Sequence, residues 1–191
     1  MKGIPRPGEK VMFTGGKNKK IFSGVTAADG KFDILIPKGD TYDVKYRSIN
    51  GDVDYKKFSI PTEEGLFTYE YILKYDLPRT VTLDNVFFDT GKSSLRPESY
   101  TALETLLEVM KLKPSLVIEI AGHTDNVGTS ESNMILSLNR ANSVKGYLVK
   151  KGIASERILT KGYGDTQPVA DNETDESRQK NRRTEVRIVE E

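Results

Sequence analysis

In the first 75 residues, apolar side chains come in short runs that turn signals separate. Tyr42–Tyr46 alternates apolar and polar positions, a period of two that is typical of a strand with one buried face. Asp29-Gly30 and Asn50-Gly51 favour tight turns, because these residues accept the positive φ that a hairpin needs. The pattern predicts six short strands and therefore a small antiparallel β-sandwich. The strands are expected from Val11 onward and at Lys20–Thr26, Phe32–Ile36, Tyr42–Tyr46, Asp54–Ile60 and Leu66–Leu73.

From Pro78 onward, the pattern changes to strands that alternate with helices. Residues 97–113 and 133–151 predict helices from apolar positions at helical spacing, and Gly152 is a suitable residue to end the second one. The first helix is expected to bury Leu103, Leu106, Leu107 and Met110. The second is expected to bury Met134, Leu138, Ala141, Val144 and Leu148. Strands are expected at Val81–Phe88, Leu116–Ala121, Arg157–Tyr163 and Thr184–Val189, with a short charged helix over 174–182.

The change of pattern near Pro78 predicts a domain boundary, because proline stops strand pairing and stiffens a crossing. We therefore expect a β-sandwich over residues 1–77 and a β-α-β-α-β domain over residues 78–191. The expected fold class is α+β, with the helices of the second domain packed on a mixed sheet.

Composition narrows the range of functions. Lys and Arg total 29 against 28 for Asp and Glu, so the chain lacks the positive field that holds nucleic acid or anionic lipid. It has no cysteine and a single histidine, which excludes a thiolate site or a zinc site with two imidazoles. We expect no metal and no cofactor.

The sequence has no apolar stretch long enough to span a membrane as a helix, and no signal peptide follows Met1. Two interpretations stay open, a cytoplasmic protein or an exported one whose signal is absent from this chain.

The candidate chemistry centres on Asp125 and Arg140. The run Gly122–Asp125 directly follows a predicted strand, at the end where α/β sheets expose ligand groups, and Arg140 lies fifteen residues after Asp125, inside the second long helix. Helical geometry puts Arg140 about 100° from the centre of the apolar stripe, at the shoulder of the buried face. A carboxylate and a guanidinium suit a ligand that carries an ammonium and a carboxylate on one carbon. The free end of meso-diaminopimelate has both groups, whereas lysine in its place has no carboxylate for Arg140.

Several stretches of this half match a known family. They are Val86–Asp89, Gly122–Asp125, Asn133 with Leu136–Ala141, Gly162–Gly164 with Pro168, and Asn181–Arg183 with Glu185 and Val186. On these motifs, the region from Val81 to Val189 resembles the OmpA-like peptidoglycan-binding domain of OmpA-type porins, the lipoprotein Pal and the stator protein MotB. One departure is Ser177, where many members have glycine.

The resemblance implies a function and a set of site residues. It implies that Asp125 and Arg140 hold diaminopimelate, with lesser roles for Thr124, Asn133 and Leu136, and that Phe88 and Asp89 line the same groove. It implies non-covalent binding of peptidoglycan rather than catalysis. The expected location is the periplasm of a Gram-negative bacterium, where the protein would tether the outer membrane or an envelope complex to the cell wall.

The N-terminal half more weakly resembles the carboxypeptidase-regulatory or transthyretin-like β-sandwich. The matching parts are Gly3–Val11 and Thr26–Phe32, and the first strand usual in that family is missing upstream of Gly3. The sequence does not identify a ligand of this half, and binding of another envelope protein is left open as one interpretation.

Plainer interpretations stand beside these. Asp125 could only form an Asx-turn, and Asp89 could cap the end of a strand. His123 is expected to be a packing residue, and Arg182 and Arg183 are expected to tie the last helix to nearby carboxylates. Leu136 could be ordinary core edge, and the aromatic residues before Pro78 are expected to form core rather than a sugar platform. The whole protein could instead be a wall-degrading glycosidase or a purely structural interaction protein.

Overall fold

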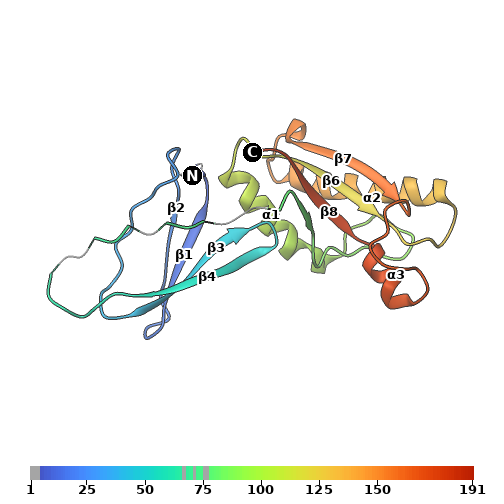
Figure 1. Ribbon diagram of the computed structural model, residues 1–191. Helices are drawn as coiled ribbons and strands as arrows, with labels where there is room; N and C mark the ends of the chain where they lie inside the picture. The colour runs from blue at the N-terminus through green and yellow to red at the C-terminus, as the bar shows by residue number, and fades with distance from the viewer. Residues whose placement is uncertain (1–4, 66–67, 71, 75–77) are drawn as a thin grey trace. The chain divides into compact units, whose positions relative to one another are not determined.

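The computed structural model describes residues 5–65, 68–70, 72–74 and 78–191. The chain divides into two compact units, Met1–Leu77 and Pro78–Glu191. The first unit holds an antiparallel sheet and the second a mixed sheet with helices, which confirms the expected α+β class (Figure 1).

The first unit is built on four antiparallel strands in the order β2-β1-β3-β4. Their bounds are Lys10–Gly15 for β1, Ile21–Val25 for β2, Thr41–Ser48 for β3 and Gly51–Ser59 for β4. The expected turn at Asn50-Gly51 joins β3 to β4, and Gly51 has a φ of 122° that only glycine adopts without strain.

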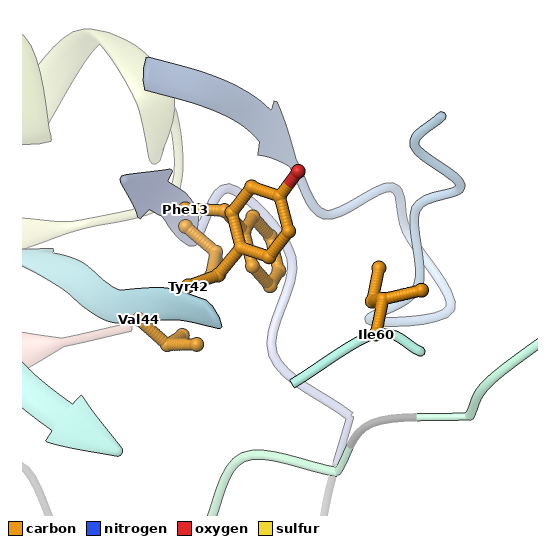
Figure 2. Close-up of a cluster of buried hydrophobic side chains, with 5 residues drawn as sticks. Phe13, Tyr42, Val44 and Ile60 are labelled. Carbon is orange, nitrogen blue, oxygen red and sulfur yellow. The ribbon is translucent and has the colours of Figure 1, made fainter. Parts of the chain in front are cut away.

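The core of this unit is aromatic. It comprises Val11, Phe13, Tyr42, Val44 and Ile60 (Figure 2). The Phe58 ring lies 5.9 Å from the Phe13 ring and 5.7 Å from the Tyr42 ring, between centroids. Tyr42 is fully buried, and its hydroxyl donates to the carbonyl of Pro37 at 2.6 Å, so its polar group is satisfied. These aromatic residues therefore form core, as expected from the sequence.

The expected strand at Phe32–Ile36 is wrong in one respect. The alternation is correct, since Phe32, Ile34 and Ile36 pack against the core while Leu35 is 86% exposed. The segment nevertheless belongs to no strand of the sheet. A period of two reports which side chains face the core, but it does not show whether the backbone has a pairing partner. The expected strand at Leu66–Leu73 lies partly outside the described residues, and those of its residues that are described belong to no strand.

The second unit has a mixed sheet in the order β5-β8-β6-β7, in which β6 and β7 are parallel and the other pairs antiparallel. The strands span Thr80–Thr82 for β5, Val117–His123 for β6, Ile158–Gly164 for β7 and Thr184–Glu190 for β8. The helices span Tyr100–Leu112 for α1, Ser130–Lys150 for α2 and Asp175–Asn181 for α3. Short 3₁₀ turns cover Pro97–Ser99 and Ser155–Arg157. Helices α1 and α2 lie behind the sheet in Figure 1.

Strand β5 is shorter than the expected Val81–Phe88. Leu83 still donates its N–H to the carbonyl of Thr184, but Asn85 then adopts a φ of 62°. This left-handed conformation turns the chain out of the extended form. Phe88 makes only an isolated bridge to Leu95.

Helix α2 begins earlier than expected. Ala141, Val144 and Leu148 are buried as expected, but the first half of the helix buries a different face. Thr129 caps its N-terminus by accepting a hydrogen bond from the N–H of Ser132, so the helix begins at Ser130. Met134 and Leu138 were expected in the core, but they are 38% and 39% exposed. The buried residues of α2 are Asn133, Ser137, Arg140, Ala141, Val144 and Leu148.

Glycines in the sheet explain this rotation of α2. A Cβ at Gly122 would collide with the carbonyl of Ser137, and one at Gly162 would lie 2.6 Å from the carbonyl oxygen of Met134. The helix backbone therefore rests directly on β6 and β7 at residues without side chains. Ser137 fits this contact because its hydroxyl accepts the N–H of Gly164 at 2.9 Å. The close approach turns Asn133 and Arg140 toward the loop that follows β6.

Candidate functional site

Asp125 lies two residues beyond β6 and is buried. Its Oδ1 accepts the N–H of Val127 at 3.1 Å, which is the Asx-turn that the plainer interpretation expects. Its Oδ2 accepts from Arg182 Nη1 at 2.6 Å. The N–H of the preceding Thr124 donates to the carbonyl of Gly164 at 2.9 Å and fixes the loop to β7. Asp125 is thus a rigidly held carboxylate with one cationic partner.

Arg182 was expected to tie the last helix to a carboxylate, and the structure confirms this. That carboxylate is Asp125 itself, the centre of the candidate site. Its Nε and Nη2 both donate to Gln179 Oε1, at 3.2 and 2.6 Å. The run Asn181-Arg182-Arg183 was the available signal, although nothing in its spacing identifies Asp125 as the partner.

Arg140 is buried on α2, not at the shoulder of the buried face as expected. Its Nε donates to the carbonyl of Lys92 at 3.0 Å and its Nη2 to the carbonyl of Asp89 at 3.4 Å. The guanidinium carbon lies 5.1 Å from the centroid of the Phe88 ring. These contacts fix the guanidinium through neutral groups, and among the described residues no carboxylate lies within ion-pair distance of it.

The charges of the site act on one another. Burial lowers the pKa of Arg140, the negative charge of Asp125 raises it, and the positive charge of Arg182 lowers it further. Asn133 links α2 to the loop, because its Nδ2 donates to the backbone carbonyl of Asp125 at 3.2 Å. The structure therefore brings Asp125, Asn133 and Arg140 together, from a loop and from two turns of one helix.

The other expected residues differ in how they reach the site. Thr124 is buried, and its hydroxyl has no hydrogen-bond partner in the described part of the chain. Phe88 is half-buried with its ring against Arg140. Asp89 reaches Arg140 only through its carbonyl, while its exposed carboxylate pairs with Lys92 at 3.4 Å. Leu136 is half-buried on α2.

Comparison with known proteins identifies a match within the second unit. Residues 87–182, which are half of the chain, match the OmpA family. The chain belongs to the OmpA family.

Three relatives of this OmpA-family chain illustrate the likeness. The chain is 45% identical over 108 residues to outer membrane porin F of Pseudomonas fluorescens, covering 56% of this chain and 33% of the porin. It is 40% identical over 106 residues to the peptidoglycan-binding protein ArfA of Mycobacterium bovis, covering 56% of this chain and 32% of ArfA. The crystal structure of the peptidoglycan-associated lipoprotein from Burkholderia pseudomallei matches with a TM-score of 0.50 at 28% identity, covering 60% of this chain and 91% of that one. The chain thus spans about a third of the length of the porin and of ArfA.

Beside the site, His123 of the OmpA-family unit is a buried packing residue. Its ring stacks on Tyr163 with centroids 5.2 Å apart and planes 6° from parallel. Its Nε2 lies 3.4 Å from Glu185 Oε2. Burial, reinforced by the nearby charge of Arg183, lowers the pKa of His123 to about 4, so the imidazole is neutral at pH 7.

Glu185 is the centre of a charged network on the same face of the sheet as His123. Its two carboxylate oxygens accept from Arg183 Nε at 2.8 Å and from Arg187 Nη2 at 2.9 Å. Burial raises the pKa of Glu185, but these hydrogen bonds more than offset it and leave the pKa lowered. The network keeps the start of β8, which follows Arg182, in a fixed position.

Within the described ranges, no cluster of three His, Cys, Asp or Glu side chains could hold a metal ion. No helix among the described residues is long and apolar enough to cross a membrane.

Proposed function

We propose that the unit Pro78–Glu191 binds peptidoglycan without covalent chemistry, through the free end of meso-diaminopimelate in its stem peptide. The names of two relatives support the general class, since ArfA is described as peptidoglycan-binding and the Burkholderia protein as peptidoglycan-associated. The choice of diaminopimelate comes from the chemistry of the site.

The single observation that carries this proposal is the charge of Arg140. Within the described residues, the buried guanidinium is held by carbonyl groups and an aromatic ring. Asp125 acts on it electrostatically, but no carboxylate forms a direct ion pair with it. Such a group favours an anionic ligand, because an unpaired buried charge is costly. A carboxylate supplies that anion and matches the planar guanidinium. No hydrogen bond within the described residues engages Arg140 Nη1, which is therefore available to the ligand.

The ammonium of the ligand has a partner in Asp125. Its carboxylate already accepts from Val127 and Arg182, and each oxygen retains a further lone pair for an ammonium donor. The hydroxyl of Thr124, which is buried without a partner in the described chain, can complete the set. A ligand that carries both an ammonium and a carboxylate satisfies Asp125 and Arg140 at once, whereas a lysine side chain leaves Arg140 without an anion.

This binding would place the protein in the bacterial envelope. We propose that it acts in the periplasm of a Gram-negative bacterium, anchoring the outer membrane or an envelope complex to the wall. We also propose that residues 1–77 form a separate domain that docks an envelope protein. An alternative is that this docking is the main function and residues 78–191 are a passive spacer.

The deciding experiment is a calorimetric titration of the whole chain with meso-diaminopimelate. The variant Arg140→Met keeps the length of the side chain and removes its charge, and Asp125→Asn does the same for the carboxylate. Each should weaken binding about tenfold to a hundredfold, because one charge-assisted contact is lost. The control is Arg96→Met, which removes an exposed arginine whose ion pair in the described part of the chain is with exposed Glu98, and which should bind like wild type.

Two results would contradict the proposal. Equal affinity in wild type and in both site variants would show that the ligand does not bind at this site. Release of soluble muropeptides from purified sacculi would show a wall-degrading enzyme instead. If sacculi sediment wild type and both site variants equally, the alternative function is favoured.

A further inference from the structure

A pair of stacked tyrosines lies on the surface of the same unit. Tyr100 at the start of α1 and Tyr147 near the end of α2 have ring centroids 5.3 Å apart and planes at 16°. Tyr100 remains 41% exposed despite this contact. On Tyr147, the Nζ of Lys151 lies 5.5 Å from the ring centroid. Because the rings stack, each covers one face of the other, and Lys151 lies over Tyr147. The aromatic face that remains partly exposed is therefore the outer face of Tyr100, with a cation beside the pair.

This pair is connected to the candidate site along α2. Arg140 and Tyr147 are seven residues apart, which is two helical turns, so they lie on the same side of the helix about 10 Å apart along its axis. A second connection runs through the segment that contacts Arg140. Phe88 packs on Arg140, and the backbone of its neighbour Phe87 makes two hydrogen bonds with the side chain of Ser99, directly before Tyr100.

The chemistry of the pair fits a carbohydrate better than a protein. The face of an aromatic ring packs against the apolar C–H face of a sugar, and the hydroxyl and ammonium groups nearby can bond to sugar oxygens. The residues around the pair are polar and exposed, including Thr101, Lys150 and Lys151. Two rings in such surroundings are too small for a stable protein interface, which buries several hundred Å² on each partner.

We propose that Tyr100, supported from behind by the stacked ring of Tyr147, forms a second subsite that packs against a sugar ring of the glycan strand while the first subsite holds diaminopimelate. This inference rests on the proposed function. In the stem peptide, two residues separate diaminopimelate from the sugar, and an extended segment of three residues spans about 10 Å. The side chain of diaminopimelate, whose free end the first subsite holds, adds to that length, so one ligand is long enough to reach a subsite two helical turns from Arg140.

The test compares three ligands by calorimetric titration of the whole chain. They are free meso-diaminopimelate, the stem tripeptide that ends in meso-diaminopimelate, and the same tripeptide attached to the N-acetylglucosaminyl-N-acetylmuramyl disaccharide. Wild type should bind the disaccharide form about three- to tenfold more tightly than the tripeptide. Tyr100→Ala should abolish this difference and leave the affinities for the other two ligands unchanged. Tyr100→Phe keeps the ring and should retain the preference.

The outcomes separate the two proposals. Equal affinity of wild type for the tripeptide and its disaccharide form overturns the sugar subsite while the diaminopimelate site stands. A preference that survives in Tyr100→Ala overturns the assignment to this pair. If wild type binds none of the three ligands, the proposed function fails and the sugar subsite fails with it. Unchanged binding of free diaminopimelate by Tyr100→Ala also shows that this variant is folded.

Discussion

Arg182, at the C-terminal end of α3, donates a hydrogen bond of 2.6 Å to Asp125, on the loop after β6. The two residues are 57 positions apart in the chain. Only 11% of the Asp125 side chain and 28% of the Arg182 side chain are exposed, so this pair is screened less than a surface pair. The last helix therefore holds the carboxylate that we assign to the ligand ammonium.

Removing Arg182 should destabilise the unit that contains it. Arg182→Gln leaves Asp125 buried without its cation and should lower the free energy of unfolding by about 1–2 kcal/mol. Arg182→Lys should recover part of this, because one ammonium can pair with Asp125 but cannot also make the paired contact with Gln179. Urea unfolding, with amide exchange of β6 and β8 to identify the unit, measures the effect. Unfolding of Arg182→Gln at the wild-type urea concentration would contradict the finding that this pair is structural.

The contact between Gly122 and Ser137 gives a second prediction. Gly122→Ala places a methyl group against the helix backbone, which cannot move aside as a side chain can, and should cost about 3 kcal/mol or more. It should also abolish binding of diaminopimelate, since Asn133 and Arg140 move with α2. The matched control is Gly146→Ala, where a methyl group meets nothing within 4 Å.

Gly146 lies inside α2, so its replacement by alanine should stabilise the protein by about 0.5–1 kcal/mol and leave binding unchanged. Thermal unfolding of the two variants provides the comparison. If both alanine variants shift the melting temperature in the same direction, close helix-to-sheet contact does not explain the position of α2.

Much of this unit could be predicted because its signals are local. Periodicity located both long helices, and the motif around Asp125 and the run Leu136–Ala141 identified residues that the structure brings together. The same periodicity also identified Ala141, Val144 and Leu148 as core, but it did not identify the buried face of the first half of α2. Hydrophobicity favours Met134 and Leu138 as core, but the glycines of β6 and β7 allow a serine to face the sheet instead.

Sequence analysis also did not identify the partners of the charged side chains. The sequence indicated that Arg182 pairs with a carboxylate. It did not indicate Asp125, because the two residues are 57 positions apart and no periodic pattern relates them. Arg140 was expected at the shoulder of the buried face because Met134 and Leu138 were counted in the apolar stripe. Both are exposed, and the fold buries Arg140 against an aromatic ring and two carbonyls. Pairing of distant charges follows from tertiary structure, not from local pattern.

The buried imidazole of His123 predicts a loss of stability in acid. The unfolded chain takes up a proton near the ordinary histidine pKa of 6.5, but the folded chain does so only near pH 4. Protons therefore favour the unfolded state as pH falls through this window, and the free energy of unfolding should drop by about 2–3 kcal/mol between pH 7 and pH 4.5. Glu185 adds a further loss at lower pH, because its pKa is lowered in the folded state.

Urea unfolding at pH 4.5, 5.5 and 7 tests this, with His123→Phe as the comparison. The substitution keeps a flat ring against Tyr163 and removes the titrating group. Its stability should change less than that of wild type between pH 7 and pH 4.5. Parallel pH profiles for the two proteins would show that other groups cause the acid sensitivity.

Arg157 ties the end of α1 to the start of β7 and gives the last prediction. Its Nε donates to the carbonyl of Leu116 at 3.0 Å, and its Nη2 donates to the carbonyls of Met110 at 2.9 Å and Lys113 at 2.7 Å. It thereby satisfies carbonyls at a helix C-terminus, where a cation is also favoured by the helix dipole. Arg157→Met keeps the apolar stem but removes the guanidinium donor from these carbonyls, of which that of Lys113 still accepts the N–H of Leu116. It should lower the free energy of unfolding by about 2–4 kcal/mol. Arg157→Lys should restore less than half, because one ammonium cannot reach all three carbonyls, and Arg96→Met should have almost no effect. Denaturant titration of the three variants measures these effects. A neutral surface substitution changes stability by up to roughly 0.5 kcal/mol. If Arg157→Met stays within that range of wild type, Arg157 does not cap the helix.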